Sequence, residues 1–211
     1  MLREDIKEFL ITIPEDVTVV AATKYVNSDN MIDLFNNGVT NFGENRVDSF
    51  LTKYEELKDY PITWHFIGHL QRNKAKKIIN KIDYLHSLDS LDLAFIIDSN
   101  RDTPLKCFVE VSINLEETKN GVAYHDINKF MDELLKYKNI EVVGLMMMAV
   151  KAASKEELLN QFKGLAFLRD KLEKEYSIKL PYLSMGMSDD YSEAIAMGAT
   201  HIRLGRILWK L

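Results

Sequence analysis

The sequence predicts an α/β fold in which short buried strands alternate with amphipathic helices. Eight short apolar runs recur along the chain, and segments with helical periodicity separate most of them. The starts of these runs are mostly 20 to 25 residues apart, a spacing typical of parallel βα units. Eight such units fit a closed single-domain (β/α)8 TIM barrel, at the short end of the size range of that fold. An open doubly wound sheet is the alternative.

The eight expected strands share β-branched and apolar residues. They are residues 17–23, 39–43, 62–68, 84–88, 105–112, 140–148, 180–186 and 200–205. Apolar stripes at helical spacing predict helices over 47–57, 127–135 and 158–172. Four serines stand where helix N-caps are expected, namely Ser28, Ser90, Ser154 and Ser188.

Composition favours one domain over residues 1–211. The chain is 46% hydrophobic and 28% charged, and no low-complexity segment or Pro/Gly/Ser-rich linker divides it. The net charge of −5 argues against a chain-wide surface for nucleic acid. The longest apolar run, "VVGLMMMAV", is too short to span a bilayer. We therefore expect neither nucleic acid nor membrane as a partner.

The single cysteine, Cys107, excludes an internal disulfide and fits a reducing compartment. It lies within the apolar run "LKCFVEV", which favours an inert core thiol over a nucleophile. Charges interrupt the apolar residues of the N-terminal stretch "MLREDIKEFL", so no signal peptide is expected. These features predict a cytoplasmic protein.

The stretch "VTVVAATKYV" ends a buried strand on a lysine, Lys24. Read alone, it favours a strand that surfaces, with the ammonium group in water. In a barrel the active site lies at the carboxyl ends of the strands, and Lys24 stands at such an end. The barrel prediction therefore favours an amine that reacts in a pocket.

Two glycine-containing loops indicate a phosphate site. "SMGMSDD" follows the seventh expected strand and "RLGRILW" follows the eighth, which is the usual place of a phosphate in this barrel. Asp189 and Asp190 would repel an anion, so we expect the phosphate nearer Ser184 and the backbone of Gly205 and Arg206. A capped helix and a tight turn with no ligand are the alternative.

Three other stretches carry weaker signals. Asn45 follows the second expected strand, where it would cap a helix. His65 and His69 have the four-residue spacing of metal ligands on a helix, but a strand is expected there and no set of three or four ligands stands out, so we expect no metal. Lys119, in a polar loop, reaches over the barrel mouth or lies in solvent. Motifs for nucleotide, dinucleotide and serine-hydrolase chemistry are missing.

Seven motifs together resemble one family. "AATKYV", "NFGENRV", "WHFIGHLQRNK", "LHSLDS", "NLEETKNGV", "GLMMMA" and "LSMGMSDDYSEAIAMGATHIRLG" fall in the order seen in the pyridoxal phosphate homeostasis proteins. The resemblance covers nearly the whole chain. It implies the barrel half of the alanine racemase fold (fold type III), without its second domain.

The resemblance also implies a cofactor, pyridoxal 5′-phosphate (PLP), held as a lysine aldimine. The implied cofactor-binding residues are Lys24, Asn45, Ser184, Arg203, Gly205 and Arg206. Lys24 would form the Schiff base, and Arg203 would face the pyridine nitrogen. Ser184 and the backbone of Gly205 and Arg206 would hold the phosphate. Two positions depart from the family pattern, since Val26 replaces a common second lysine and Arg206 a common hydroxyl residue.

The resemblance implies a carrier or buffer for PLP and amino-acid balance, without strong catalysis and without catalytic residues. Its expected partners are PLP, free amino acids and, transiently, PLP-dependent apo-enzymes, and it would be a monomer or a weak dimer. A PLP-dependent amino-acid racemase is the alternative. Racemisation needs acid/base groups on both faces of the substrate, and 211 residues leave no room for the second domain that supplies one of them in the fold relatives. A barrel for another phosphorylated metabolite is a third hypothesis.

Overall fold

The structure, a computed structural model, describes residues 2–112 and 120–210 and contains a closed parallel barrel. Its strands are β1 (Thr18–Ala22), β2 (Asn41–Glu44), β3 (Thr63–Phe66), β4 (Tyr84–Leu88), β5 (Leu105–Ser112), β6 (Val122–Ala123), β7 (Ile140–Met146), β8 (Tyr182–Ser184) and β9 (His201–Leu204). The short strand β6 pairs in parallel with the last two residues of β5 and is not part of the ring. Each of the eight strands expected from the sequence is present, and β6 is an addition that the sequence pattern did not predict.

Parallel strand pairing runs all the way round the barrel. β1 pairs in parallel with both β2 and β9, and β4 pairs with β5, so the eight barrel strands form a continuous ring. The prediction of a (β/α)8 barrel is confirmed, and the open doubly wound alternative is wrong. Because all strands are parallel, their carboxyl ends meet at one end of the ring.

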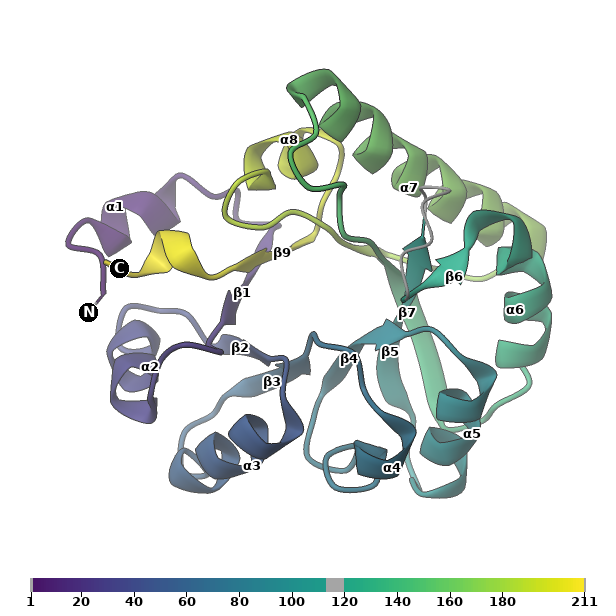
Figure 1. Ribbon diagram of the computed structural model, residues 1–211, viewed down its shortest axis with the longest axis horizontal. Helices are drawn as coiled ribbons and strands as arrows, with labels where there is room; N and C mark the ends of the chain where they lie inside the picture. Colours follow the sequence, from purple (N-terminus) through teal and green to yellow (C-terminus); the bar gives the residue numbers. More distant parts are fainter. Residues whose placement is uncertain (1, 113–119, 211) are drawn as a thin grey trace.

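Helices surround the barrel (Figure 1). They are α1 (Ile6–Ile11), α2 (Ser28–Phe35), α3 (Val47–Glu56), α4 (Arg72–Ala75), α5 (Leu91–Ser99), α6 (Ile127–Leu134), α7 (Lys155–Tyr176) and α8 (Tyr191–Ala196), with short 3-10 turns η1 (Tyr124–Asp126) and η2 (Arg206–Leu208). Their apolar faces pack on the outside of the strands, which gives the large core between the two layers. The helices predicted at 47–57, 127–135 and 158–172 correspond to α3, α6 and α7.

The serine caps were predicted with mixed success. Ser154 caps α7 in a capping box with Glu157, as expected. Ser90 is the N-cap residue of α5, although its side chain makes no capping hydrogen bond. Two predictions were wrong. Ser28 is the first residue of α2, which Asn27 caps, and Ser188 lies in the loop before α8.

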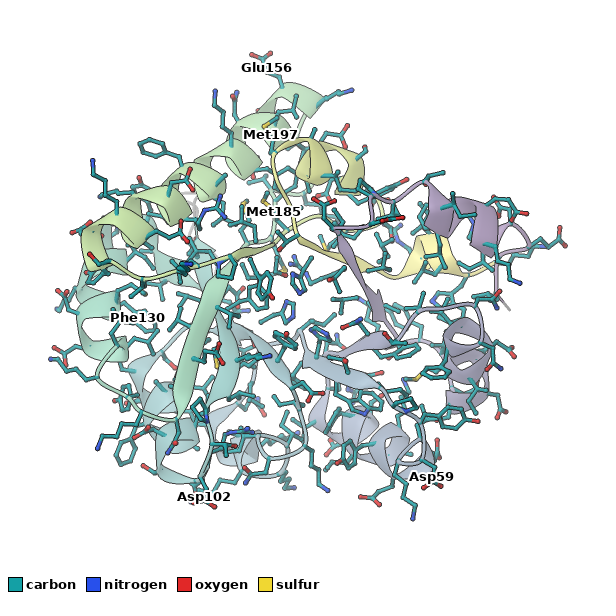
Figure 2. All side chains as sticks on the ribbon, turned by 180° about the vertical axis from the view of Figure 1, so that it is seen from behind. Asp59, Asp102, Phe130, Glu156, Met185 and Met197 are labelled. Atoms are coloured by element: carbon teal, nitrogen blue, oxygen red, sulfur yellow. The ribbon has the colours of Figure 1, made fainter. Side chains whose placement is uncertain are left out.

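Side chains fill the space that the ribbon leaves inside the ring of strands (Figure 2). One part of this interior is aromatic, with Phe108 packed against Tyr84 and Tyr182. Strands β7 and β8 approach closely at Gly144, where a Cβ atom would lie 1.9 Å from the carbonyl oxygen of Tyr182. Cys107 is fully buried, and burial raises the pKa of its thiol. Among the described residues, no helix is long and apolar enough to cross a membrane.

Candidate functional site

A pocket of about 250 Å³ opens at the carboxyl end of the barrel. It lies where β1, β8 and β9 end, and its lining residues are Ala22, Lys24, Tyr25, Val26, Met187, Ser188, Asp189, Arg203, Gly205, Arg206 and Trp209. The structure therefore brings together four of the six residues predicted to bind a cofactor. They are Lys24, Arg203, Gly205 and Arg206.

Lys24 stands on the turn that follows β1, with its side chain exposed. Its ammonium nitrogen lies 4.8 Å from the ring centroid of Tyr25, which is itself 76% exposed. The residue before it, Thr23, is fully buried, and its backbone N–H donates to the carbonyl of Gly43 at 3.0 Å. The turn is thus anchored at its base while the amine stays accessible.

A buried ion pair supports this turn from behind. Lys53, on α3, donates to Glu44 Oε1 at 2.5 Å and to the carbonyl oxygen of Thr23 at 2.6 Å. The Thr23 hydroxyl donates to the same Glu44 oxygen at 2.6 Å. The sequence analysis did not predict that Lys53 and Glu44 hold the turn that carries Lys24. Their contact joins a helix to the strand before it, and the sequence pattern does not show which side chains of two such elements meet.

Arg203 is a buried cation at the floor of the pocket. Its Nη1 donates to Ser184 Oγ at 2.6 Å, and its Nη2 donates to the carbonyl of Met147 at 2.8 Å. Burial lowers the pKa of Arg203 to about 10, while Glu110 and Asp190 act in the opposite direction. The guanidinium therefore stays charged at neutral pH and offers only donors.

A cradle of backbone donors lies beside it. The N–H groups of Gly205 and Ile207 point at one oxygen, Ser188 Oγ, at 3.2 and 3.4 Å. A Cβ added at Gly205 would meet only Ala22, at 3.7 Å or more, so the packing of the chain itself does not require glycine. The glycine instead leaves room on the pocket side, which suits an anion close to the backbone. The sequence analysis treated Ser188 as a helix cap and did not predict these two contacts.

Ser184 is not among the residues that line this pocket. It is fully buried inside the barrel, where its hydroxyl contacts Arg203 and lies 2.8 Å from Nδ1 of His86. That this hydroxyl contacts a phosphate stays a prediction, and its two existing contacts, with Arg203 and His86, argue against it.

Asn45 also lies outside the pocket lining. It does not cap α3, whose N-cap residue is Arg46, so the capping hypothesis was wrong. Its Oδ1 atom is buried and has no hydrogen-bond partner among the described residues. Gly68 packs directly on it, since a Cβ there would lie 2.4 Å from the Asn45 carbonyl oxygen. Asn45 is thus held at the end of the barrel, and its Oδ1 atom is a hydrogen-bond acceptor without a donor among the described residues.

The two departures from the family pattern both lie at the pocket. Val26 lines it where the second lysine would stand. The exposed Arg206 side chain pairs with Asp189, which places its charge on the rim. The polar loop after β5 lies partly outside the described residues, and Lys119 is among those that are not described.

A second titratable group faces the barrel interior from β5. Glu110 is buried, and burial together with Asp89 raises its pKa to about 7, while Arg203 lowers it. The Nδ1 atom of His69 lies 3.3 Å from Asp89 Oδ2. Among the described residues, no group of three or more acidic, histidine or cysteine side chains could hold a metal ion.

Comparison with known proteins identifies the family. The family model described as "Alanine racemase, N-terminal domain" matches residues 6–211. A pyridoxal phosphate homeostasis protein of Aquifex aeolicus is 39% identical over 194 residues, which cover 90% of this chain and 85% of that protein. The chain belongs to the pyridoxal phosphate homeostasis protein family. Another member of that family, from Synechocystis, is 35% identical over 96% of this chain and 94% of its own length.

Solved structures agree with this membership of the pyridoxal phosphate homeostasis protein family. PipY of Synechococcus elongatus, solved with PLP bound, is 31% identical and superposes with a TM-score of 0.91 over 97% of this chain and 100% of its own. Alanine racemase of Clostridium difficile is 17% identical, with a TM-score of 0.76 over 100% of this chain and 58% of the racemase chain. The racemase likeness shows the shared barrel fold alone.

Proposed function

We propose that this chain binds PLP through Lys24 and acts in PLP and amino-acid homeostasis, as the names of its relatives indicate. One observation carries the proposal. The pocket at the barrel mouth presents an accessible lysine amine, a buried arginine and the backbone of Gly205 within a single lining, with the N–H group of Ile207 beside it. PipY, which shares the whole fold, was solved with PLP bound.

The pocket suits this cofactor in size and chemistry. Its volume of about 250 Å³ lies just below the range of roughly 300 to 1,000 Å³ typical of ligand sites, as expected for a small ligand. PLP, when bound, supplies an aldehyde that condenses with a primary amine and draws electrons into its ring. Lys24 offers the amine, and the remaining groups of the pocket recognise the rest of the molecule.

Each end of the cofactor has a matching group. The N–H groups of Gly205 and Ile207, which donate to Ser188 Oγ in this structure, would together with that hydroxyl hold the phosphate, since charge-assisted bonds to an anion are among the stronger hydrogen bonds. Arg203 would donate to the ring nitrogen. The unpaired Oδ1 of Asn45 at the same end of the barrel is an acceptor for a further contact. The whole of residues 1–211 forms the one PLP-binding domain.

Arg203 contributes to the expectation of a carrier over a strong catalyst, but it does not by itself exclude catalysis. It stays cationic at neutral pH and cannot accept a hydrogen bond, so it cannot hold a proton on the ring nitrogen. This weakens the electron sink that α-carbon chemistry needs. Exchange with free amino acids, transfer to apo-enzymes and a cytoplasmic location stay predictions.

A racemase-like enzyme is the second candidate, and Glu110 is the observation that favours it. A carboxyl group with a pKa of about 7 inside the barrel is suited to proton transfer near neutral pH. The two candidates differ in what happens to the α-proton of a bound amino acid. The carrier leaves that proton in place, whereas a racemase removes it.

The testing experiment has two parts. The purified protein mixed with PLP should show the visible absorption of a lysine-linked cofactor, and Lys24→Ala should not; equal spectra would refute binding through Lys24. The loaded protein is then incubated with alanine in heavy water. We expect α-proton exchange far below about 1 s⁻¹, an ordinary enzymatic turnover. Exchange at that rate or faster, dependent on Lys24 and lost in Glu110→Gln, would favour the enzyme.

A further inference from the structure

A row of hydrogen-bonded polar side chains crosses the barrel interior and ends at Arg203. It joins five strands in turn, through Asn41, His65, His86, Ser184 and Arg203. The four contacts measure 2.9 Å (Asn41 Oδ1 to His65 Nε2), 2.8 Å (His65 Nδ1 to His86 Nε2), 2.8 Å (His86 Nδ1 to Ser184 Oγ) and 2.6 Å (Ser184 Oγ to Arg203 Nη1). We call these five residues the interior chain.

The two end residues of the interior chain, Arg203 and Asn41, determine which partner donates and which accepts in each of its hydrogen bonds. Arg203 has donors only, so Ser184 Oγ accepts from it. Asn41 presents its carbonyl oxygen to His65, because its amide nitrogen donates to Thr40. A neutral imidazole has one donor and one acceptor. All four bonds form at once only if both histidines carry their proton on Nε2 and the Ser184 hydroxyl donates to His86.

The surroundings keep both histidines in this neutral form. His65 and His86 are fully buried, and burial lowers the pKa of each well below its ordinary value. The neighbouring His201 acts on both in the same direction, and Arg203 adds to the effect on His86. A doubly protonated imidazole could not accept a hydrogen bond, so neutrality preserves the interior chain. Bonds that all run one way polarise and strengthen one another.

The interior chain leaves Ser184 no proton to give to a ligand. Its single O–H is committed to His86, and its oxygen receives Arg203. Arg203 is then held at two points, by Ser184 through Nη1 and by the carbonyl of Met147 through Nη2. The guanidinium plane at the floor of the pocket is therefore set by residues that do not line the pocket.

We propose that Ser184, backed by His86, is a positioning residue that orients Arg203 toward the ring end of the cofactor and takes no part in binding the phosphate. This inference rests on the proposed function, since it assigns Arg203 to the cofactor ring. It separates Ser184 from Ser188, two serines four residues apart with different roles. Ser184 acts through the barrel interior, whereas Ser188 lies in the pocket lining with the phosphate cradle.

The test compares pyridoxal with PLP in Ser184→Ala and in Ser188→Ala. Ser184→Ala should weaken both ligands by the same factor, about five- to tenfold, and should shift the absorption maximum of the bound cofactor. Ser188→Ala should weaken PLP more than pyridoxal and leave the maximum in place. Ser184→Thr keeps a hydroxyl and should restore the wild-type maximum, which a loss of folding or packing alone would not allow.

Loss of PLP affinity alone in Ser184→Ala, with pyridoxal unchanged, would overturn the inference by placing Ser184 at the phosphate. An unchanged spectrum and unchanged affinities would overturn it too. A measurement on the ligand-free protein tests the interior chain independently of the proposed function. In the wild-type protein, nitrogen NMR should find His65 and His86 protonated on Nε2 alone, and a proton on Nδ1 of His86 would break the interior chain. Failure of the wild-type protein to bind PLP would instead refute the proposed function.

Discussion

The ammonium group of Lys53 lies 2.5 Å from Glu44 Oε1 inside the protein, directly behind the turn that carries Lys24. Both side chains are nearly or fully excluded from solvent. Glu44 keeps a second oxygen that is buried and has no partner among the described residues. Because a buried charge is costly when its counter-charge is removed, this pair links the stability of the barrel end to the position of the reactive amine.

We predict that Lys53→Met lowers the free energy of unfolding by about 3 to 5 kcal/mol, because it leaves the Glu44 carboxylate buried and unpaired. Lys74→Met is the matched control, since the Lys74–Asp48 pair is exposed at 3.5 Å, and it should cost less than about 1 kcal/mol. Urea unfolding measures both. Similar decreases in the free energy of unfolding of the two variants would contradict the prediction that the buried Lys53 pair matters more for stability than the exposed Lys74 pair.

The two glycines at 144 and 164 should respond to alanine in opposite ways. Gly144→Ala would place a Cβ 1.9 Å from the carbonyl oxygen of Tyr182, so the strands must separate, at a cost of at least about 1 to 3 kcal/mol. Gly164 lies within α7 with nothing near its Cβ position, and Gly164→Ala should stabilise the protein by about 0.5 to 1 kcal/mol. Thermal unfolding of both variants distinguishes the signs. A tolerated alanine at 144 would contradict the close approach of β7 and β8.

Stability should fall as the pH falls below the ordinary histidine value of about 6.5. Burial lowers the pKa of His201 to about 4 and those of His65 and His86 well below normal, so these groups stay neutral when folded. The unfolded chain therefore binds more protons in this range, and the free energy of unfolding decreases with falling pH. Urea unfolding of the ligand-free protein between pH 7.5 and 5 measures this.

Glu110 contributes to the same pH dependence with the opposite sign. Its folded pKa of about 7 exceeds the unfolded value of roughly 4.3, so the folded protein binds more protons between the two, and this contribution to stability is lost as the pH rises toward 7. Glu110→Gln should therefore make the loss of stability below pH 6.5 steeper. An unchanged or shallower pH dependence in this variant would contradict the assigned sign.

Cys107 should not react with a thiol reagent in the folded protein. It is fully buried and burial raises its pKa, so almost none of the reactive thiolate exists at neutral pH. One equivalent should react after unfolding in urea, since the chain has a single cysteine. Rapid reaction without denaturant would show that β5 is exposed in solution.

The barrel could be predicted from the sequence because its signal is local and repeated. Each barrel strand is a short apolar run, and the regular alternation with helices leaves few topologies. The position of Lys24 at the pocket followed from the same logic, since the carboxyl ends of parallel strands meet. Strand β6 was not predicted, because a strand of two residues is too short to show a periodic pattern of apolar residues.

The interior of the site could not be predicted, because its contacts join residues far apart in the sequence. Ser184 was assigned to the phosphate from its place at a strand end, yet its partner His86 is 98 positions away. A strand pattern predicts which residues share a face, but it does not predict how deep in the barrel each one lies. Ser188, four residues later, was missed for the same reason, since its cradle forms with the loop after β9.

The most direct test of the account is to find the lysine to which PLP is attached. The protein is loaded with PLP, reduced with borohydride to make the linkage permanent, digested and mapped by mass spectrometry, with Lys24→Arg treated in parallel. Lys24 is the only lysine that lines the pocket among the described residues, so we expect the label on Lys24 in the wild-type protein and its loss in the variant. A label mainly on Lys119 or on scattered surface lysines, retained in Lys24→Arg, would contradict the central claim.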